Sequence, residues 1–465
     1  MATPVKWGSE FLVNTTTVSE QSSPAITGLA NGRFVVVWRD FSQTGGDPNF
    51  FAVRAQVFNA DGSASGAEFM VNTTTVNSQF EPTITALTDG RFVVAWEVAS
   101  GGFPDHAIRA QVFNADESTS GSELLVNTTT ANLQSEPTIT SLADGRFVVA
   151  WTDYSANGGD TSAAAIRAQV FNANGSVSGA EFLINSATAG SQDQPTITAL
   201  ANGRFVVVWA DNSATGGDTS GSAIRAQEFN ANGSTFGTEF QVNTISVGNQ
   251  ILPTITGLAD GRFVVTWKDG SDINGYSVRA QTFNADGSTS GAEFLVNTTT
   301  DLDQTQPTTT ALADGRFVMA WVDTSLLVGN PFGAAIVAQL FNANGSTSGA
   351  EFLVSTGNIS GQYPPAITVL ADGRFAVAWT DASMTGGDTS GAAIRAQIFD
   401  PREAAPQGTM ITSAPGLATR FRTVSARTSS PVRRAMTRCW AGRAMISCLA
   451  GRAMTGCLAA AALTG

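Results

Sequence analysis

The sequence predicts an all-β protein, a seven-bladed β-propeller in which each blade holds four antiparallel strands. The tripeptide Gly-Arg-Phe occurs seven times, at steps of 58, 55, 58, 58, 54 and 58 residues. A tryptophan follows six residues after each of its glycines. Repeats too short for a core of their own are typical of folds that stack one unit against the next. The tryptophans are Trp38, Trp96, Trp151, Trp209, Trp267, Trp321 and Trp379.

Each unit contains four strand-like runs, as the fourth unit illustrates. The first run, 195–200, follows a proline and alternates between apolar and polar residues. The second, 204–209, is continuously apolar, which suits a strand covered on both faces. The third, 223–229, alternates again, and the fourth, 239–243, is short and half polar, as expected of an edge strand. Gly- and Asn-rich turns separate the runs, and no segment has a helical period.

The two ends of the repeat region predict how the ring closes. The first strand-like run, 10–14, matches the fourth strand of the unit, whereas the last run, 393–399, matches the third. The seventh blade therefore takes one strand from the N-terminal end and three from the C-terminal end. This closure pairs strand edges that would otherwise be open. We expect residues 1–400 to form one propeller domain.

Charge and composition exclude several classes of partner. The net charge is −13, but residues from 402 onward contain nine arginines and one acidic residue. The remaining 16 basic and 37 acidic residues give the body a charge of −21. Because nucleic acids and anionic membranes are polyanions, we expect neither as a partner. No run approaches the roughly 20 apolar residues that span a bilayer, and the first 14 residues contain no apolar leader segment.

The basic tail, 401–465, differs from the repeat and holds all three cysteines. Arg-Ala-Met recurs at Arg434, Arg443 and Arg452, and the cysteines recur with the same period of nine. Translated one base earlier, G-rich codons for this segment give Gly-Gly-x-Gly-Asn-Asp, the calcium-binding nonapeptide of β-rolls. We hypothesise a frameshifted nonapeptide repeat. As written, the tail is expected to be disordered, with at most a helix over 433–462.

The repeat unit reads GxEFxVNTTT…QxxPTITxLADGRFVVxWxDxSxxGGDTSGxAIRAQxFNADGS. Over residues 8–400 it resembles the repeat of large secreted bacterial proteins that carry hemolysin-type (RTX) calcium-binding repeats. The resemblance implies an extracellular protein that a type I system exports without an N-terminal signal peptide. It also implies calcium as a cofactor.

The loop after the tryptophan is the candidate metal site. It reads Asp-x-Ser-x-x-Gly-Gly-Asp in three units and nearly so in the first. Two carboxylates, a hydroxyl and flexible glycines are suited to an oxygen cage for calcium. The alternative, which we favour, is a hairpin turn in which aspartate caps backbone amides. The candidate ligands are Asp40, Asp47, Asp153, Asp160, Asp211, Asp218, Asp381 and Asp388.

Catalysis has little support in the repeat. His106 is the only histidine, which excludes Ser-His-Asp and Cys-His sites, and we expect it to be a solvated bystander. The arginine of each Ile-Arg-Ala-Gln, such as Arg167, is expected to pair across strands with the aspartate of Trp-x-Asp. The blades read as near copies whose acids recur with them. We therefore expect no enzyme.

These observations favour a secreted, monomeric, non-enzymatic binding, display or adhesion module whose partner is an extracellular glycan or protein. Two alternatives stay open: a carboxylate-dependent polysaccharide hydrolase or lyase, and a ligand-free spacer. Blade asymmetry discriminates between them. An enzyme should bring acidic and aromatic residues from unlike loops together at one mouth of the ring.

Overall fold

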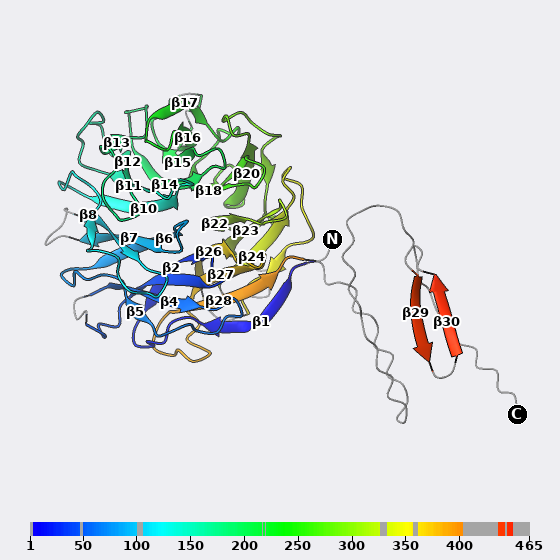
Figure 1. Ribbon diagram of the computed structural model, residues 1–465. Coiled ribbons are helices and arrows are strands. Elements are labelled where there is room, and N and C mark those ends of the chain that lie inside the picture. The colour runs from blue at the N-terminus through cyan, green and yellow to red at the C-terminus, as the bar shows by residue number, and fades with distance from the viewer. Residues whose placement is uncertain are drawn as a thin grey trace, which may run out of the picture. The chain divides into compact units, whose positions relative to one another are not determined.

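The computed structural model describes residues 3–46, 50–99, 106–215, 217–218, 220–325, 333–356 and 361–402, together with the backbone of 436–441 and 444–449. Two compact units are present, residues 1–403 and 404–465. The first is a ring of seven four-stranded antiparallel sheets (Figure 1), which confirms the predicted propeller. No helix occurs among the described residues.

The strands of each blade have the following bounds. Blade 1 holds β2 (Gln21–Gly28), β3 (Phe34–Asp40), β4 (Ala52–Phe58) and β5 (Phe69–Met70). Blade 2 holds β6 (Gln79–Ala86), β7 (Phe92–Ala99), β8 (His106–Phe113) and β9 (Leu124–Leu125). Blade 3 holds β10 (Gln134–Ser141), β11 (Phe147–Asp153), β12 (Ala165–Phe171) and β13 (Phe182–Leu183). Blade 4 holds β14 (Gln192–Ala199), β15 (Phe205–Asp211), β16 (Ala223–Phe229) and β17 (Thr235–Gln241). Blade 5 holds β18 (Gln250–Gly257), β19 (Phe263–Asp269), β20 (Ser277–Phe283) and β21 (Phe294–Leu295). Blade 6 holds β22 (Gln304–Ala311), β23 (Phe317–Asp323), β24 (Ala335–Phe341) and β25 (Phe352–Leu353). Blade 7 holds β26 (Gln362–Val369), β27 (Phe375–Asp381), β28 (Ala393–Asp400) and β1 (Val5–Leu12).

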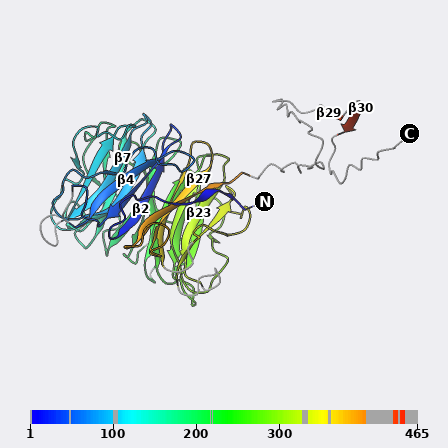
Figure 2. The same cartoon turned by 90° about the horizontal axis from the view of Figure 1, so that it is seen from below.

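The strand order fixes which residues face the centre. In every blade the first strand of the repeat lies innermost, and it contacts the first strands of both neighbouring blades. Figure 2 shows the blades edge-on, with strands such as β2, β4 and β7 running through the thickness of the ring. Side chains at either end of a first strand are therefore positioned at one of the two mouths.

Closure of the ring follows the prediction. Strand β1 pairs antiparallel with β28, from Val5 opposite Asp400 to Leu12 opposite Arg395. The strand starts earlier than the predicted run 10–14, because residues from Val5 onward already pair with β28. A bulge between Trp7 and Phe11 accommodates this extension.

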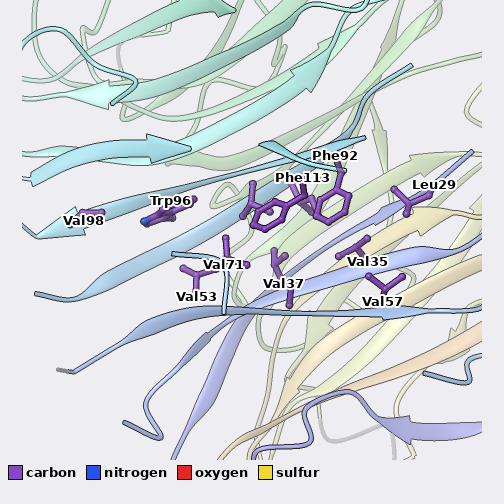
Figure 3. Packing of buried hydrophobic residues seen from close by; sticks show 13 residues of the cluster. Leu29, Val35, Val37, Val53, Val57, Val71, Phe92, Trp96, Val98 and Phe113 are labelled. Atoms are coloured by element: carbon purple, nitrogen blue, oxygen red, sulfur yellow. The ribbon is translucent and has the colours of Figure 1, made fainter. Parts of the chain in front are cut away.

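Apolar side chains fill each interface between blades, and Figure 3 shows one of them. Trp96 and Phe92 of blade 2 pack with Val37 and Val53 of blade 1. All seven repeat tryptophans are at most 1% exposed. The second strand of each blade is apolar along its whole length because neighbouring blades cover both of its faces.

A polar latch also joins neighbouring blades. In blade 1, the carboxylate of Glu68 accepts hydrogen bonds from the backbone amides and hydroxyls of Thr15 and Thr16, at 2.7 to 3.1 Å. In each of blades 2 to 6, an equivalent glutamate accepts a hydrogen bond from a backbone amide of the preceding blade. Glu10 completes the set by accepting from the amide and hydroxyl of Thr356.

The second unit contains a two-stranded antiparallel sheet, β29 (Met436–Ala441) with β30 (Ala444–Leu449). The helix considered for 433–462 is wrong over these residues, since they pair as strands. Beyond Arg402, the other tail residues lie outside the described part of the chain, so the disordered tail and the frameshifted nonapeptide stay predictions. The minus-one reading frame of the gene after codon 402 tests the latter. No helix among the described residues is long and apolar enough to cross a membrane.

Candidate functional site

One residue from each innermost strand stands directly before the repeat proline, in a β-bulge. In blade 3, for example, the register between β10 and β11 shifts between Ser135 and Thr138. In six blades the pre-proline residue has a positive φ of 44 to 57°. This backbone conformation costs energy for any residue except glycine. A bulge re-aims the side chain it carries. The seven residues are Ser23, Glu81, Glu136, Gln194, Leu252, Gln306 and Pro364.

Six of these seven residues, all but Ser23, line one cavity of about 400 Å³. Its walls come from the first strands of blades 2 to 7, so it occupies the centre of the ring at one mouth. Two carboxylates face it, Glu81 and Glu136, and they come from adjacent blades. The corresponding residues of the other five blades are uncharged.

Glu136 is held by two donors on the same carboxylate oxygen. The hydroxyl of Thr152 and the backbone amide of Gln194 each donate to Oε2 at 2.8 Å. The Gln194 amide reaches Glu136 from the next blade, at a residue with φ +57°. The inverted backbone of the bulge therefore helps to orient a carboxylate as well as the residue that carries it.

Blade 2 departs from the repeat beside this cavity. Where other blades have Trp-x-Asp, it has Trp96-Glu97-Val98. Glu97 is 6% exposed, and the Nδ1 of His106 forms a hydrogen bond with its Oε1. Phe80 stacks on the imidazole at 6.3 Å between ring centroids. The expectation that His106 is a solvated bystander is wrong, because β8 starts at His106 and places it opposite β7.

Three carboxyl groups of this region, those of Glu81, Glu97 and Asp193, have pKa values raised toward neutral pH. Burial raises the pKa of Glu97 to about 7, and the Glu136 charge adds to this effect. Glu81 is accessible to water within the mouth, yet its burial by the surrounding protein raises its pKa to about 7. The charges of Glu97 and Glu136 raise this pKa further, and the charge of Arg39 opposes them. Burial and then Glu136 raise the pKa of Asp193 to about 6. Acids in unlike environments supply proton donors and acceptors at one pH.

Tyr154 adds an aromatic residue to the same region. Burial and the negative charges of Glu136, Asp193 and Glu97 raise the pKa of its hydroxyl to about 12. We define the acidic mouth as the following residues of blades 2 to 4: Glu81, Glu97, His106, Glu136, Tyr154 and Asp193.

The opposite mouth has different chemistry. A cavity of about 470 Å³ there is lined by alanine, leucine, valine and glycine from the far ends of the first strands of blades 4 to 7. No charged residue lines it. The cavities at the two mouths therefore differ in polarity, and of these two cavities only the one at the acidic mouth is lined by carboxylates.

The predicted metal ligands fall into two structural roles. The first aspartate of each loop accepts hydrogen bonds from arginine, glutamine and serine. In blade 3 the carboxylate of Asp153 accepts from Arg167 Nε and Gln134 Nε2 at 2.6 Å, and from the amide and hydroxyl of Ser155 at 2.8 Å. Asp40, Asp211 and Asp381 are bound in the same way. The predicted arginine–aspartate pair is thus present in these blades.

The second aspartate of each loop caps a turn. Asp160 accepts from the amide of Ser162 at 3.1 Å and from Asn185 Nδ2 at 2.9 Å. Asp218 and Asp388 make the same contacts, and Asp47 lies outside the described residues. Within the described ranges, no group of three or more His, Cys, Asp or Glu residues could hold a metal. These contacts favour the turn interpretation, and calcium binding by the loops stays a prediction.

The acidic mouth is not among the sites predicted from the sequence, because those predictions rest on acids that recur in the repeat. The assumption that every acid recurs with its blade is wrong at the pre-proline position, where only units 2 and 3 have glutamate. A comparison of the seven units at this position reveals the two glutamates from the sequence alone. The sequence does not reveal the bulge that directs these residues toward the centre of the ring.

Comparisons with known proteins support the fold. No family model and no curated protein matches the chain. A Dyadobacter fermentans protein of unknown function aligns over 86% of this chain and 99% of its own, at 11% identity and a TM-score of 0.51. The alpha-L-arabinanase of Penicillium chrysogenum aligns over 84% and 99%, at 14% identity and 0.47. The alpha-L-arabinofuranosidase of Fusarium graminearum aligns over 73% and 98%, at 11% identity and 0.49.

These findings correct the expectation of a non-enzymatic binding, display or adhesion module. The named neighbours among the solved structures are glycosidases, so this fold also occurs in enzymes, and the prediction that the chain is no enzyme is corrected. At 11 and 14% identity these neighbours show the fold of this chain and not its activity. The physical reason lies in the acidic mouth. Acids and aromatic rings from unlike blades converge there, which is the asymmetry expected of an enzyme.

Proposed function

We propose that the chain is a carboxylate-dependent glycoside hydrolase that acts on a polysaccharide. The observation that carries the proposal is the pair Glu81 and Glu136, placed on adjacent blades at one cavity of the ring. Hydrolysis of a glycosidic bond needs two carboxyl groups, one that donates a proton and one that acts as base or nucleophile.

Glu81 is assigned as the general acid. Its pKa of about 7 keeps much of it protonated in neutral and mildly acidic solution, so that it can protonate the leaving oxygen. Glu136 is assigned as the partner carboxylate. The Thr152 hydroxyl and the Gln194 amide hold its Oε2, which leaves Oε1 to face the sugar or a water molecule.

Glu97 and His106 are assigned as positioning residues. Glu97 accepts a hydrogen bond from the backbone amide of Glu136, and the Nδ1 of His106 forms a hydrogen bond with Oε1 of the same carboxyl group. Loss of either partner would move Glu136 or change the charge beside it. We expect their removal to weaken catalysis less than loss of Glu81 or Glu136.

Reducing-end release from a panel of arabinan, galactan, polygalacturonate and alginate tests the proposal. Glu81→Gln and Glu136→Gln should each lower kcat roughly 10²- to 10⁴-fold on the polymer that the wild type cleaves. Glu117→Gln, in the turn after β8, is the matched control and should retain activity. An inactive wild type across the panel, or full activity in both variants at unchanged Tm, contradicts the assignment.

A further inference from the structure

A second cavity, of about 610 Å³, opens between blades 7 and 1. Pro364 lines both this cavity and the central one, so the two adjoin. Its lining includes Ser22 and Arg39 of blade 1 with Tyr363 and Met384 of blade 7. We call these four residues the Arg39 pocket.

The repeat shows that the fold does not require the Arg39 pocket. The position after the repeat tryptophan holds arginine in blade 1 and Glu, Thr, Ala, Lys, Val and Thr in the others. The position of Tyr363 holds Ser, Phe, Ser, Asp, Ile and Thr elsewhere. Residues that the ring needs, such as the buried tryptophan, recur in all seven blades. Arg39 and Tyr363 are therefore available for recognition.

The guanidinium of Arg39 is oriented but only partly used. Nε and Nη2 donate to the hydroxyl of Ser22 at 3.1 and 2.8 Å, and Nη2 lies 3.2 Å from Glu20 Oε1. Glu20 is 48% exposed, so solvent screens this ion pair and makes it weak. Nη1 has no partner among the described residues. A rigid, partly exposed guanidinium edge is suited to a carboxylate.

A row of aromatic rings connects the Arg39 pocket to the acidic mouth. The guanidinium lies 4.4 Å from the centroid of Phe51, and Phe51 packs on Phe80 at 5.6 Å. Phe80 in turn stacks on His106, the partner of Glu97. Tyr363, which lines the cavity, is 51% exposed. An exposed tyrosine offers an apolar face for a sugar ring and a hydroxyl for hydrogen bonding.

We propose that the Arg39 pocket binds an acidic sugar, a residue that carries a carboxylate, next to the glycosidic bond in the central cavity. Arg39 binds the sugar carboxylate and Tyr363 packs against the sugar ring. This inference rests on the proposed function, because it assigns the substrate class of the same site. A neutral polysaccharide would have no group to pair with the guanidinium.

The test measures binding in the full chain carrying Glu136→Gln, so that turnover does not interfere. Isothermal titration uses oligosaccharides of polygalacturonate, alginate and hyaluronan, each paired with the same material after reduction of its carboxylates to alcohols. We expect at least one acidic oligosaccharide to bind about tenfold or more tighter than its reduced form. Arg39→Gln should remove this preference and leave binding of the reduced form unchanged. Tyr363→Ala should weaken both forms.

Arg146→Gln is the matched control, because it removes the same charge at an arginine of similar exposure, 23% against 25%. It should leave every affinity unchanged. The inference is overturned if no acidic oligosaccharide binds. It is also overturned if Arg39→Gln changes the affinity for acidic and reduced forms equally, because Arg39 would then only balance the charge of Glu81. Arg39-dependent binding without cleavage by the wild type would instead refute only the hydrolase. If the wild type and Arg39→Gln cleave a neutral polymer at the same rate, only the acidic-sugar pocket is refuted.

Discussion

Each position of the repeat is sampled seven times, so the chain itself distinguishes residues that the ring needs from residues that it does not. The glutamine that starts each first strand is buried in all seven blades, and so is the tryptophan. In six of the seven blades, the pre-proline residue varies among Ser, Glu, Gln and Leu but keeps one backbone geometry with positive φ. Positive φ at this residue is thus a property of the fold. The glutamates placed there in blades 2 and 3 are specific to those blades.

Glu97 gives a prediction about stability and pH. Its pKa is about 7 in the folded protein against an ordinary 4.5, so the folded state keeps a proton that the unfolded chain has lost between these values. The free energy of unfolding therefore falls as pH rises through this window. Glu97→Gln should abolish this loss, which is on the order of 2 kcal/mol. Calorimetric Tm values at pH 5 and 8 measure it, and equal pH slopes in variant and wild type contradict it.

The loop aspartates give a second prediction at this scale. Both oxygens of Asp153 already accept two hydrogen bonds each. We therefore expect the Tm to be the same in millimolar calcium chloride and in EDTA. A rise in Tm with calcium that Asp153→Asn and Asp160→Asn abolish would establish the calcium cage instead.

At the scale of strands, β1 differs from every other edge strand because it comes from the opposite end of the repeat region to the rest of its blade. The other outer strands belong to the same chain segment as their blades, whereas β1 joins the two ends of the repeat region through β28. Glu10 adds the seventh latch by binding Thr356 of blade 6. Stability of the whole ring therefore depends on a segment at the N-terminal end.

Deletion of residues 1–12 should lower the Tm by roughly 10 °C, because it opens the edge of β28 and exposes the apolar surface that β1 covers. Deletion of the tail from residue 404 onward is the control, and it should leave the Tm unchanged, since the tail forms a unit of its own. A truncated ring that melts at the wild-type temperature would show that β1 does not close it.

At the scale of the whole molecule, the two mouths of the ring are unequal. At one of them lie the residues of the acidic mouth, three of whose carboxyl groups have pKa values raised to about 6 or 7. The other is lined by small apolar residues. Identical blades would make each mouth uniform around the ring, whereas the pre-proline glutamates occur only in blades 2 and 3. The chemistry therefore resides in departures from the repeat, and the repeat supplies the scaffold.

The same contrast explains what the sequence could predict. Periodicity, apolar runs and turn residues determine blade number, strand order and closure, because each is repeated seven times and the ends are complementary. The acidic mouth depends on single substitutions such as Glu81 and Glu97, which periodicity averages away. It also depends on a bulge at the pre-proline residue, and a strand pattern with period two does not reveal that geometry. The RTX resemblance, calcium, secretion and a monomeric state stay predictions.

The location of bound substrate tests the central claim most directly. The claim is that the acidic mouth of blades 2 to 4 cleaves a polysaccharide. A crystal structure of the Glu136→Gln variant with an oligosaccharide of the cleaved polymer should place a glycosidic oxygen within hydrogen-bond distance of the Glu81 carboxyl group. Sugar bound at the apolar mouth or on the outer face of a blade, with the central cavity empty, would contradict the claim.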